Sequence, residues 1–493
     1  MESLSDTKWD VVISGTGLQQ SLLALALSRS GKNVLHIDPN EYYGDSEAAL
    51  SLKDADEWAE RHAAMDGDGL FAAAQVKREG DDGLAASRSY SLALAPQFIH
   101  ARSELLNQLV SSKAFRQIEF LAVGSFFVLQ PGSESTSLEL SRIPSTREDV
   151  FSNTVIPSRA KRSLMKFLRF VLQYDSEPQA QLWKSNESDP LTEFLEREFK
   201  LDSNLQSYVV TLTLSLDGKI SVGAGLAAIS RHLKSMGVFG AGFAAVYPKW
   251  GGLSEVAQVG CRAGAVGGAV YMLGVGLSGV QRTSSGDEDQ VEISLTNDVT
   301  VKSKILISNA AAASSSSVRI SRLIAVVSTP LSSMFEVVIQ GAPAPCVAVV
   351  ALPGGSISGE DGTLSQYPIY ATVHSSDTGE CPTEQCTIYL TTLTTSNSTY
   401  LLDTALRSLL AASSEFEPPK CLWRMQYEQM CGTGSFIVEN NIGTFECITP
   451  DLSFNDSILE PVQQAWQVIT GKDDDEYMKF EDREGINDDD DAF

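Results

Sequence analysis

The chain has 493 residues, 43% apolar and 20% charged, which is typical of a globular protein long enough for more than one domain. Its formal net charge of −26 argues against a nucleic-acid partner, which would require a basic surface. Seven scattered cysteines without a CxxC pair, and only five histidines, favour reduced thiols and no metal site.

A strand–helix–strand unit is predicted at the start of the chain, within residues 11–38. A glycine turn at Gly15 and Gly17 follows the first strand, and the second strand ends at Asp38. This arrangement is typical of the dinucleotide-binding pattern G-x-G-x-x-G, in which an acid after the second strand binds a ribose hydroxyl. However, Gln20 stands at the third glycine position, where helix and strand must pack closely. The motif leaves open whether the fold binds a dinucleotide or keeps its shape without one.

The middle of the chain contains three segments with different sequence patterns. Residues 45–88 are acidic and rich in Ala, Gly and Ser, and we expect an irregular surface insertion. Residues 90–129 predict a strand, a helix and an apolar strand. Residues 155–238 are helical in pattern, since their apolar residues recur at helical spacing.

Strand patterns return after residue 239. The uncharged residues 263–281 approach the length of a membrane span, but their six glycines favour a turn and a buried strand. Residues 311–317 predict a linker, and a short amphipathic helix precedes the acidic tail at 471–493. For the tail we expect a disordered, solvating end or a contact for a basic partner. The polar, acidic residues 1–10 do not resemble a secretory signal, so we expect a cytosolic protein, with a nuclear location left open.

Three sequence blocks resemble the superfamily of Rab GDP dissociation inhibitors and Rab escort proteins. They are residues 10–44, which end in Tyr42-Tyr43-Gly44, residues 90–112 and residues 246–273. Residues 147–175 resemble the escort branch, because a D-V-F-x-N loop precedes the sequence K-R-x-L-M-K-F-L. The resemblance weakens beyond about residue 320.

The resemblance implies a large FAD/NAD(P)-binding-like (flavin-monooxygenase-like) α/β domain with an inserted all-helical domain. The expected parts are 1–154 with the 45–88 insertion, the helical domain 155–238, the second part of the large domain at 239–458, and a final helix with acidic tail at 459–493. The superfamily works without flavin, so no cofactor, metal or catalytic residue is expected. Gly15, Gly17, Gln20 and Asp38 would then form a vestigial dinucleotide site.

The resemblance also implies a Rab-binding platform. Its members are Tyr43, Glu255, Gln258, Arg262, Tyr271 and Met272. Residues 255, 258 and 262 share one face of a helix, which would equally suit an ordinary solvated face. For the others, the ordinary alternatives are a tyrosine that closes a turn and residues of a strand core.

Two further sites follow from the resemblance. The helical domain would hold the prenyl group, with Leu164, Phe167, Phe170, Val171, Phe194 and Phe199 as groove candidates, although helix-bundle core explains each of them as well. The Rab C-terminus would contact Val462, Trp466 and Ile469, for which packing of the last helix is the alternative. The transferase would dock near 230–240, where His232 and Val238 depart from the expected aromatic residue and arginine.

The function implied is that of a non-catalytic escort for Rab GTPases. It would bind GDP-bound Rab, unprenylated and prenylated, together with the Rab geranylgeranyltransferase α/β heterodimer, and it would contact membranes transiently. The alternatives are a Rab GDP dissociation inhibitor that recycles prenylated Rabs and, in another class, an FAD-dependent oxidoreductase.

Overall fold

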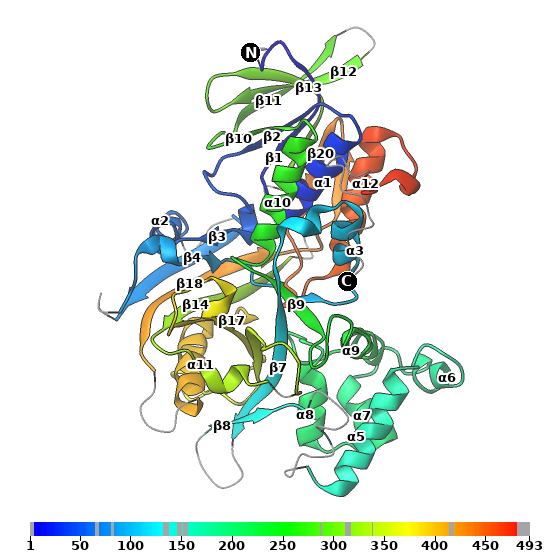
Figure 1. The fold of residues 1–493 in the computed structure, drawn as a ribbon, viewed down its shortest axis with the longest axis vertical. Helices are drawn as coiled ribbons and strands as arrows, with labels where there is room; N and C mark the ends of the chain where they lie inside the picture. Colours follow the sequence, from blue (N-terminus) through cyan, green and yellow to red (C-terminus); the bar gives the residue numbers. More distant parts are fainter. Residues whose placement is uncertain are drawn as a thin grey trace.

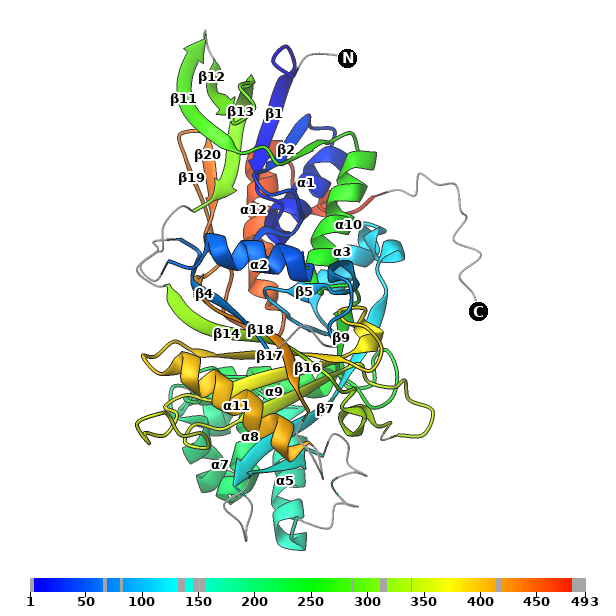
Figure 2. The same cartoon turned by 90° about the vertical axis from the view of Figure 1, so that its left-hand side faces the viewer.

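The computed structural model describes residues 4–64, 69–79, 83–131, 138–144, 150, 156–285, 288–310, 317–337, 339–413 and 419–480. The chain contains both helices and strands and begins with a strand–helix–strand unit, which confirms the predicted α/β class (Figure 1). The two larger sheets lie one above the other along the molecule, and a group of helices lies at the end opposite β11–β13 (Figures 1 and 2).

The first sheet is built on the predicted strand–helix–strand unit. β1 (Lys8–Ser14) and β2 (Val34–Asp38) pair in parallel and are joined by α1 (Leu18–Arg29). The strand order is β10-β2-β1-β13-β12-β11, and β20 pairs with β13 and β19. The added strands are β10 (Val270–Leu273), β11 (Leu277–Ser285), β12 (Glu288–Leu295), β13 (Thr300–Asn309), β19 (Phe436–Glu439) and β20 (Ile442–Phe445).

The second sheet has the order β4-β18-β14-β17-β16-β15-β7-β9-β6, and β8 pairs with β7. Its central strands are apolar runs that are buried on both faces, and α11 (Ser398–Ala412) covers one side (Figure 2). The strands are β4 (Phe71–Arg78), β6 (Ile99–His100), β7 (Phe120–Pro131), β8 (Leu138–Arg142), β9 (Ala245–Pro248), β14 (Val318–Val327), β15 (Val347–Leu352), β16 (Ile369–Ser375), β17 (Cys386–Leu393) and β18 (Cys421–Cys431). A short pair, β3 (Ala49–Leu50) and β5 (Leu92–Ala93), lies apart from both large sheets.

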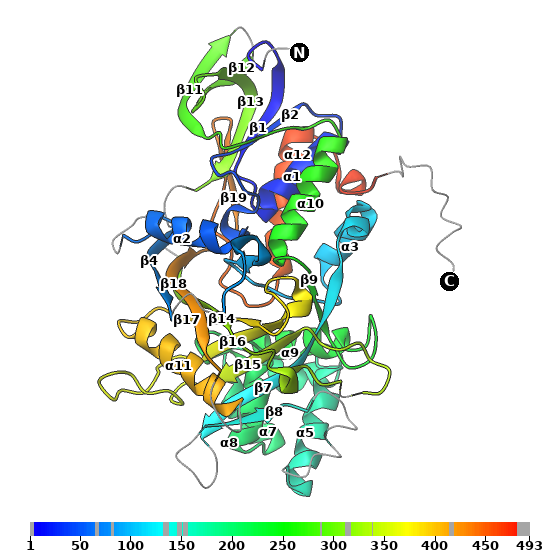
Figure 3. The ribbon, with the colours of Figure 1, turned by 60° about the vertical axis from the view of Figure 1, so that its left-hand side comes forward.

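Helix α1 is enclosed by two helices from distant parts of the sequence. Every residue from Leu18 to Ser28 is buried, because α10 (Leu253–Val266) and α12 (Leu459–Thr470) pack against this helix (Figure 3). Close packing at α10 depends on Gly264, since a Cβ there would lie 2.4 Å from the Tyr271 hydroxyl. The short α3 (Glu104–Ser111) contributes Leu105 and Leu109 to the same core.

Helices α5 to α9 share a separate core. They are α5 (Ser158–Val171), α6 (Gln179–Lys184), α7 (Leu191–Phe199), α8 (Ser203–Thr211) and α9 (Val222–Ser235). Side chains start two of them, because Asp202 accepts the Leu205 N–H at 3.0 Å and Ser221 accepts the Ala224 N–H at 3.4 Å. The resulting core is almost entirely aliphatic and aromatic.

The expectation of an irregular segment at 45–88 is wrong. Residues 52–61 form α2 (Leu52–Arg61), which Ser51 caps, and β4 adds to the edge of the second sheet. The physical reason is Trp58, 2% exposed, whose ring packs 4.9 Å from Phe71 and 5.2 Å from Tyr427. This aromatic cluster fixes the segment on the sheet, whereas residues 65–68 and 80–82 lie outside the described part of the chain.

The tail prediction is wrong for its first residues. Tyr477 and Met478 are buried against α1 and α12, and the Tyr477 ring lies 5.4 Å from that of Trp466. The apolar side chains among the acids therefore anchor the chain up to residue 480. Three further predicted segments lie outside the described residues: 481–493, residues 311–316 of the predicted linker 311–317, and the D-V-F-x-N loop apart from Val150.

The candidate membrane segment at 263–281 consists of the end of α10, a turn, β10 and the start of β11, which agrees with the predicted turn and strand. Among the described helices, none combines the length and the apolar character that a membrane span requires.

Candidate functional site

The glycine turn after β1 carries the chain into the N-terminus of α1. Gly15 has a φ of +95°, which a residue with a side chain rarely adopts. The free N–H groups and the positive end of the helix dipole make such a terminus an anion site. Here the Leu18 N–H donates to Glu47 Oε2 at 3.2 Å. The position that a diphosphate takes in dinucleotide-binding proteins therefore holds the chain's own carboxylate.

The remaining groups of the vestigial site are also occupied by the chain. Asp38 Oδ2 accepts from the Thr16 N–H at 2.7 Å and from Thr16 Oγ1 at 2.6 Å, and Asp38 is fully buried. Gln20 donates its amide to Asn309, which in turn donates to Asp45. Asp38 thus accepts hydrogen bonds from the glycine turn instead of from a ribose, and Gln20 bonds to Asn309 at the end of β13.

A small cavity of about 210 Å³ remains beside these groups, but its lining is acidic. Asp45, Glu47 and Glu446 all line it. Three carboxyl groups and a filled helix terminus oppose a diphosphate, so the residues do not fit FAD or NAD. This disfavours the oxidoreductase alternative.

Burial, together with the neighbouring Asp45 charge, raises the pKa of Glu47 to about 7, although the bond from the Leu18 N–H opposes both effects. Glu47 is 2% exposed. The cost of ionising it is therefore present only in the folded protein.

Four of the six platform candidates lie on one surface. Tyr43 is in the loop after β2, and Glu255, Gln258 and Arg262 lie on α10. Arg262 is exposed and donates to Gln258 Oε1 at 2.8 Å. Burial raises the pKa of both Tyr43 and Glu255, and the nearby Arg262 guanidinium opposes both shifts. A phenol, a carboxyl, an amide and a guanidinium are thus grouped, which is suited to directed hydrogen bonds with a polar partner.

Tyr271 and Met272 point to opposite faces of β10, as successive strand residues must. The Tyr271 ring packs 5.0 Å from the His36 ring, on the side of α10. Met272 packs in the cluster on the other side of the first sheet. The structure therefore places Tyr271 beneath the α10 surface as a support, and it does not bring Met272 to that surface.

The six groove candidates are all buried in the core of α5 to α9. They are Leu164, Phe167, Phe170, Val171, Phe194 and Phe199. Phe199 joins the others through aromatic contacts, with ring centroids 5.2 Å from both Phe167 and Phe170. In this structure they form packed core, and Phe170 also lines a hollow of about 400 Å³ on the outer side of α5.

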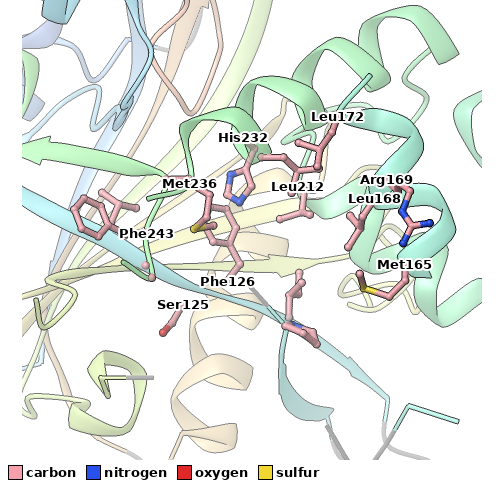
Figure 4. Close-up of a pocket in the computed structure, with 17 residues that line it drawn as sticks. Ser125, Phe126, Met165, Leu168, Arg169, Leu172, Leu212, His232, Met236 and Phe243 are labelled. Carbon is pink, nitrogen blue, oxygen red and sulfur yellow. The ribbon is translucent and has the colours of Figure 1, made fainter. Parts of the chain in front are cut away.

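An apolar cavity of about 330 Å³ lies on the next face of α5, between that helix, α9 and β7 (Figure 4). We call this the α5–α9 cavity. Its lining is Val123, Gly124, Ser125, Phe126, Ile143, Pro144, Met165, Leu168, Arg169, Leu172, Leu212, His232, Leu233, Met236, Gly242, Phe243 and Ala244. Burial lowers the pKa of His232 to about 4, so this side chain is neutral near pH 7. Arg169 is then the charged side chain of the lining.

The helix that borders this cavity was predicted from the sequence, but the apolar residues that line the cavity were not. Met165, Leu168 and Leu172 follow the helical spacing i, i+3, i+7, one face away from the buried set. Only the partial exposure of this second apolar stripe distinguishes it from the core. Glu47 and Asn309 were also missed, because nothing in their local sequence shows that they meet the turn after β1.

The three candidates on α12 have different surroundings. Val462 and Trp466 are fully buried, and the Trp466 indole donates to Ser30 Oγ at 2.9 Å. Ile469 is partly exposed beside Val468. Val462 and Trp466 therefore pack the helix against α1, and in this structure they are not available to a partner. Among the described residues, no group of three His, Cys, Asp or Glu side chains is arranged to hold a metal ion.

Comparison with known proteins shows the family to which the chain belongs. The family described as GDP dissociation inhibitor matches residues 5–338 of the chain. The chain is 31% identical over 397 residues to a Saccharomyces cerevisiae protein named Rab proteins geranylgeranyltransferase component A. That match covers 78% of this chain and 61% of the yeast protein, so the chain spans less than two thirds of this relative's length. The family match confirms the resemblance drawn from the sequence blocks.

Two solved structures have a similar fold. One is the Rab GDI from Plasmodium falciparum, with a TM-score of 0.66 and 18% identity over 94% of this chain and 98% of that one. The other is an oxidoreductase from Methanosarcina mazei, with a TM-score of 0.57 and 12% identity over 94% of this chain and 100% of that one. These likenesses show the fold alone, and they confirm the FAD/NAD(P)-binding-like class.

The buried Glu47 carboxyl predicts a pH-dependent effect of Glu47→Gln. As pH rises from about 4.5 to about 7, the unfolded chain loses this proton while the folded chain keeps it, so the free energy of unfolding falls with pH. The glutamine variant has no ionisable group at this position, so its free energy of unfolding does not fall for this reason. Relative to the parent, we expect it to gain on the order of 2 kcal/mol between about pH 5 and about pH 8.

The measurement is the difference in melting temperature between variant and parent at the two pH values. Glu193→Gln, at an exposed glutamate in the first turn of α7, controls for the loss of one acidic group. A Glu47→Gln difference that is the same at both pH values would contradict the prediction.

Proposed function

This chain belongs to the GDP dissociation inhibitor family, and we propose that it acts as a Rab escort protein. In this role it binds newly made Rab GTPases in the GDP-bound state, presents them to Rab geranylgeranyltransferase, shields the attached prenyl groups and delivers the Rab to a membrane. It is an accessory component that carries out no catalysis itself, and it works in the cytosol with transient membrane contact. The name of the yeast relative, component A of the transferase, supports the escort role.

The observation that carries this proposal is the α5–α9 cavity. An isoprenoid has no hydrogen-bonding groups, so a binding protein must offer it an apolar enclosure that is not already packed. The cavity of about 330 Å³ has the size of a small-molecule site, and its walls are mainly aliphatic and aromatic. Its place beside α5 supports it as the prenyl site in preference to the packed core residues.

The α10 surface supports the second half of the proposal, which is recognition of the GTPase. Glu255, Gln258 and Arg262 of α10, with Tyr43 of the loop after β2, offer donors and acceptors. The other face of α10 is fixed against α1. Such a rigid face loses little conformational entropy on binding. If it binds the switch regions only in their GDP-bound conformation, it stabilises that state and slows GDP release.

A Rab GDP dissociation inhibitor is the second candidate, because it would use the same cavity and the same α10 surface. It differs in that it handles only prenylated Rab and needs no transferase. The similarity in fold to the Plasmodium Rab GDI does not separate the two roles.

Truncation of the α10 surface tests Rab recognition. Arg262→Ala and Tyr43→Ala each remove a partner-facing group without opening the core, and we expect each to weaken binding of GDP-loaded Rab by about 2 kcal/mol, roughly thirtyfold. Titration calorimetry gives the affinity, and Arg407→Ala, at an exposed arginine of α11, is the matched control. If both platform variants bind within about twofold of the parent, this surface is not the Rab site.

Filling the α5–α9 cavity tests the prenyl site. Leu168→Trp replaces a leucine side chain that lines the cavity with a larger indole ring, which fills part of the space. We therefore expect the affinity for prenylated Rab to fall at least about tenfold, while unprenylated Rab binds as before. Leu182→Trp, at a leucine of α6 that is 41% exposed, is the control. Equal loss for both forms of Rab would show that the cavity does not hold the lipid.

Lipid transfer in vitro tests the escort role itself. With unprenylated Rab, geranylgeranyl diphosphate and purified transferase, we expect transfer only when this protein is added, because it must hold the GTPase and the transferase together. Turnover should be limited by release of the prenylated complex, since lipid burial contributes about 0.8 kcal/mol per CH₂ group. Extraction of prenylated Rab from membranes without any support of transfer would favour the dissociation inhibitor instead.

A further inference from the structure

Helix α5 carries a strip of cations on a strongly acidic protein. Arg159, Arg162, Lys166 and Arg169 recur at the spacing i, i+3, i+7 and i+10, so all four lie on one side of the helix, and all four are exposed. We call them the cationic strip. The whole chain has a net charge of −26, so this concentration of positive charge contrasts with the rest of the sequence.

Within the described part of the chain, no acidic side chain forms an ion pair with the cationic strip. Arg159, Arg162 and Arg169 form no ion pair with any residue in the described ranges. Nearby acids pair with other cations. Arg197 lies 3.7 Å from Asp189 and 2.9 Å from Glu198, and Lys234 lies 3.7 Å from Asp175. Lys166 donates to the backbone carbonyl of Glu198 at 3.4 Å, and its Nζ lies 5.4 Å from the centre of the Phe199 ring.

The cationic strip adjoins the α5–α9 cavity. Met165, Leu168 and Leu172 form the apolar stripe next to it, and Figure 4 shows Met165, Leu168 and Arg169 together on α5 at the cavity. A second hollow of about 400 Å³, lined by Arg162 and Lys166 among others, shares Met165 and Arg169 with the cavity. Leu172, 47% exposed, continues the apolar stripe to the surface. Positive charge and exposed apolar surface therefore meet at one place.

We propose that the cationic strip docks this protein on an anionic phospholipid bilayer, with the α5–α9 cavity turned towards the membrane. A bilayer supplies both kinds of surface that this face complements, since its headgroups are negative and its interior is apolar. An acidic partner protein would complement the positive charge of the cationic strip but not the exposed apolar surface beside it. The acidic remainder of the chain is repelled by the same headgroups, so the docked orientation is set by charge.

This inference rests on the proposed function, because an escort must bring a lipid-filled cavity to a membrane. Docking through α5 would shorten the path of the prenyl chain from protein to bilayer. It also leaves the α10 surface on a different element, so Rab binding and membrane docking are measurable separately.

The experiment is sedimentation of the full-length protein with vesicles, either of phosphatidylcholine alone or with about 30% phosphatidylserine. The test variant is Arg159→Glu with Arg162→Glu, neither of which lines the α5–α9 cavity. Arg407→Glu with Lys420→Glu, at two exposed cations, changes the net charge equally and is the control. We expect binding of the parent to require phosphatidylserine and to fall with salt.

A basic side chain at an anionic surface strengthens binding by roughly fivefold, so we expect the test variant to bind at least about tenfold more weakly, with the control near the parent. Absence of phosphatidylserine-dependent binding, or equal loss in both variants, overturns the docking proposal. The docking proposal is also overturned if the test variant still binds vesicles but no longer binds the transferase. That result would show that the cationic strip contacts an acidic protein.

Binding of unprenylated GDP-loaded Rab in solution is measured on the same samples. If Rab binds normally while vesicle docking fails, only the docking inference falls. If the parent protein does not bind GDP-loaded Rab at all, the proposed function falls independently of the vesicle result.

Discussion

The hydrogen bond from the Leu18 N–H to Glu47 occupies the N-terminus of α1, where a dinucleotide-binding protein holds its ligand. A helix that starts at a glycine turn presents unpaired N–H groups, and in a dinucleotide-binding protein the ligand completes them. Here a carboxylate of the same chain completes one of them. The loop after β2 is thereby folded back onto the start of α1, and Tyr43 on that loop is held close to Arg262 of α10. The turn that holds the ligand in dinucleotide-binding proteins here supports the α10 surface.

Helices α10 and α5 each pack one face in the core and expose another. α10 fixes one side against α1 and offers polar groups on the other, so its surface residues are held on a rigid support. α5 has a buried side, an apolar side at the cavity and a cationic side in solvent. In each case the packed face sets the position of the face that we propose for binding.

Local patterns predicted the elements that depend on local sequence. The strand–helix–strand start, the helical character of α5 and the final helix α12 follow from apolar spacing alone. The 45–88 segment was misjudged because Trp58 gains its stability from Phe71 and Tyr427, the latter far away in the sequence. The same limit applies to the sites. Spacing shows that Leu164 and Leu168 both lie on an apolar part of a helix, but only the fold shows which side is packed and which lines a cavity.

The packing of α12 against α1 has a consequence for how the protein is made. Ser30 and the indole of Trp466 are joined across 436 residues. At roughly 5–20 residues per second, a ribosome delivers the second partner about 20 to 90 seconds after the first. During that time the apolar side of α1 that later receives Val462 and Trp466 has no native cover. In the nascent chain this part of the core therefore stays open to non-native contacts until α12 has been made.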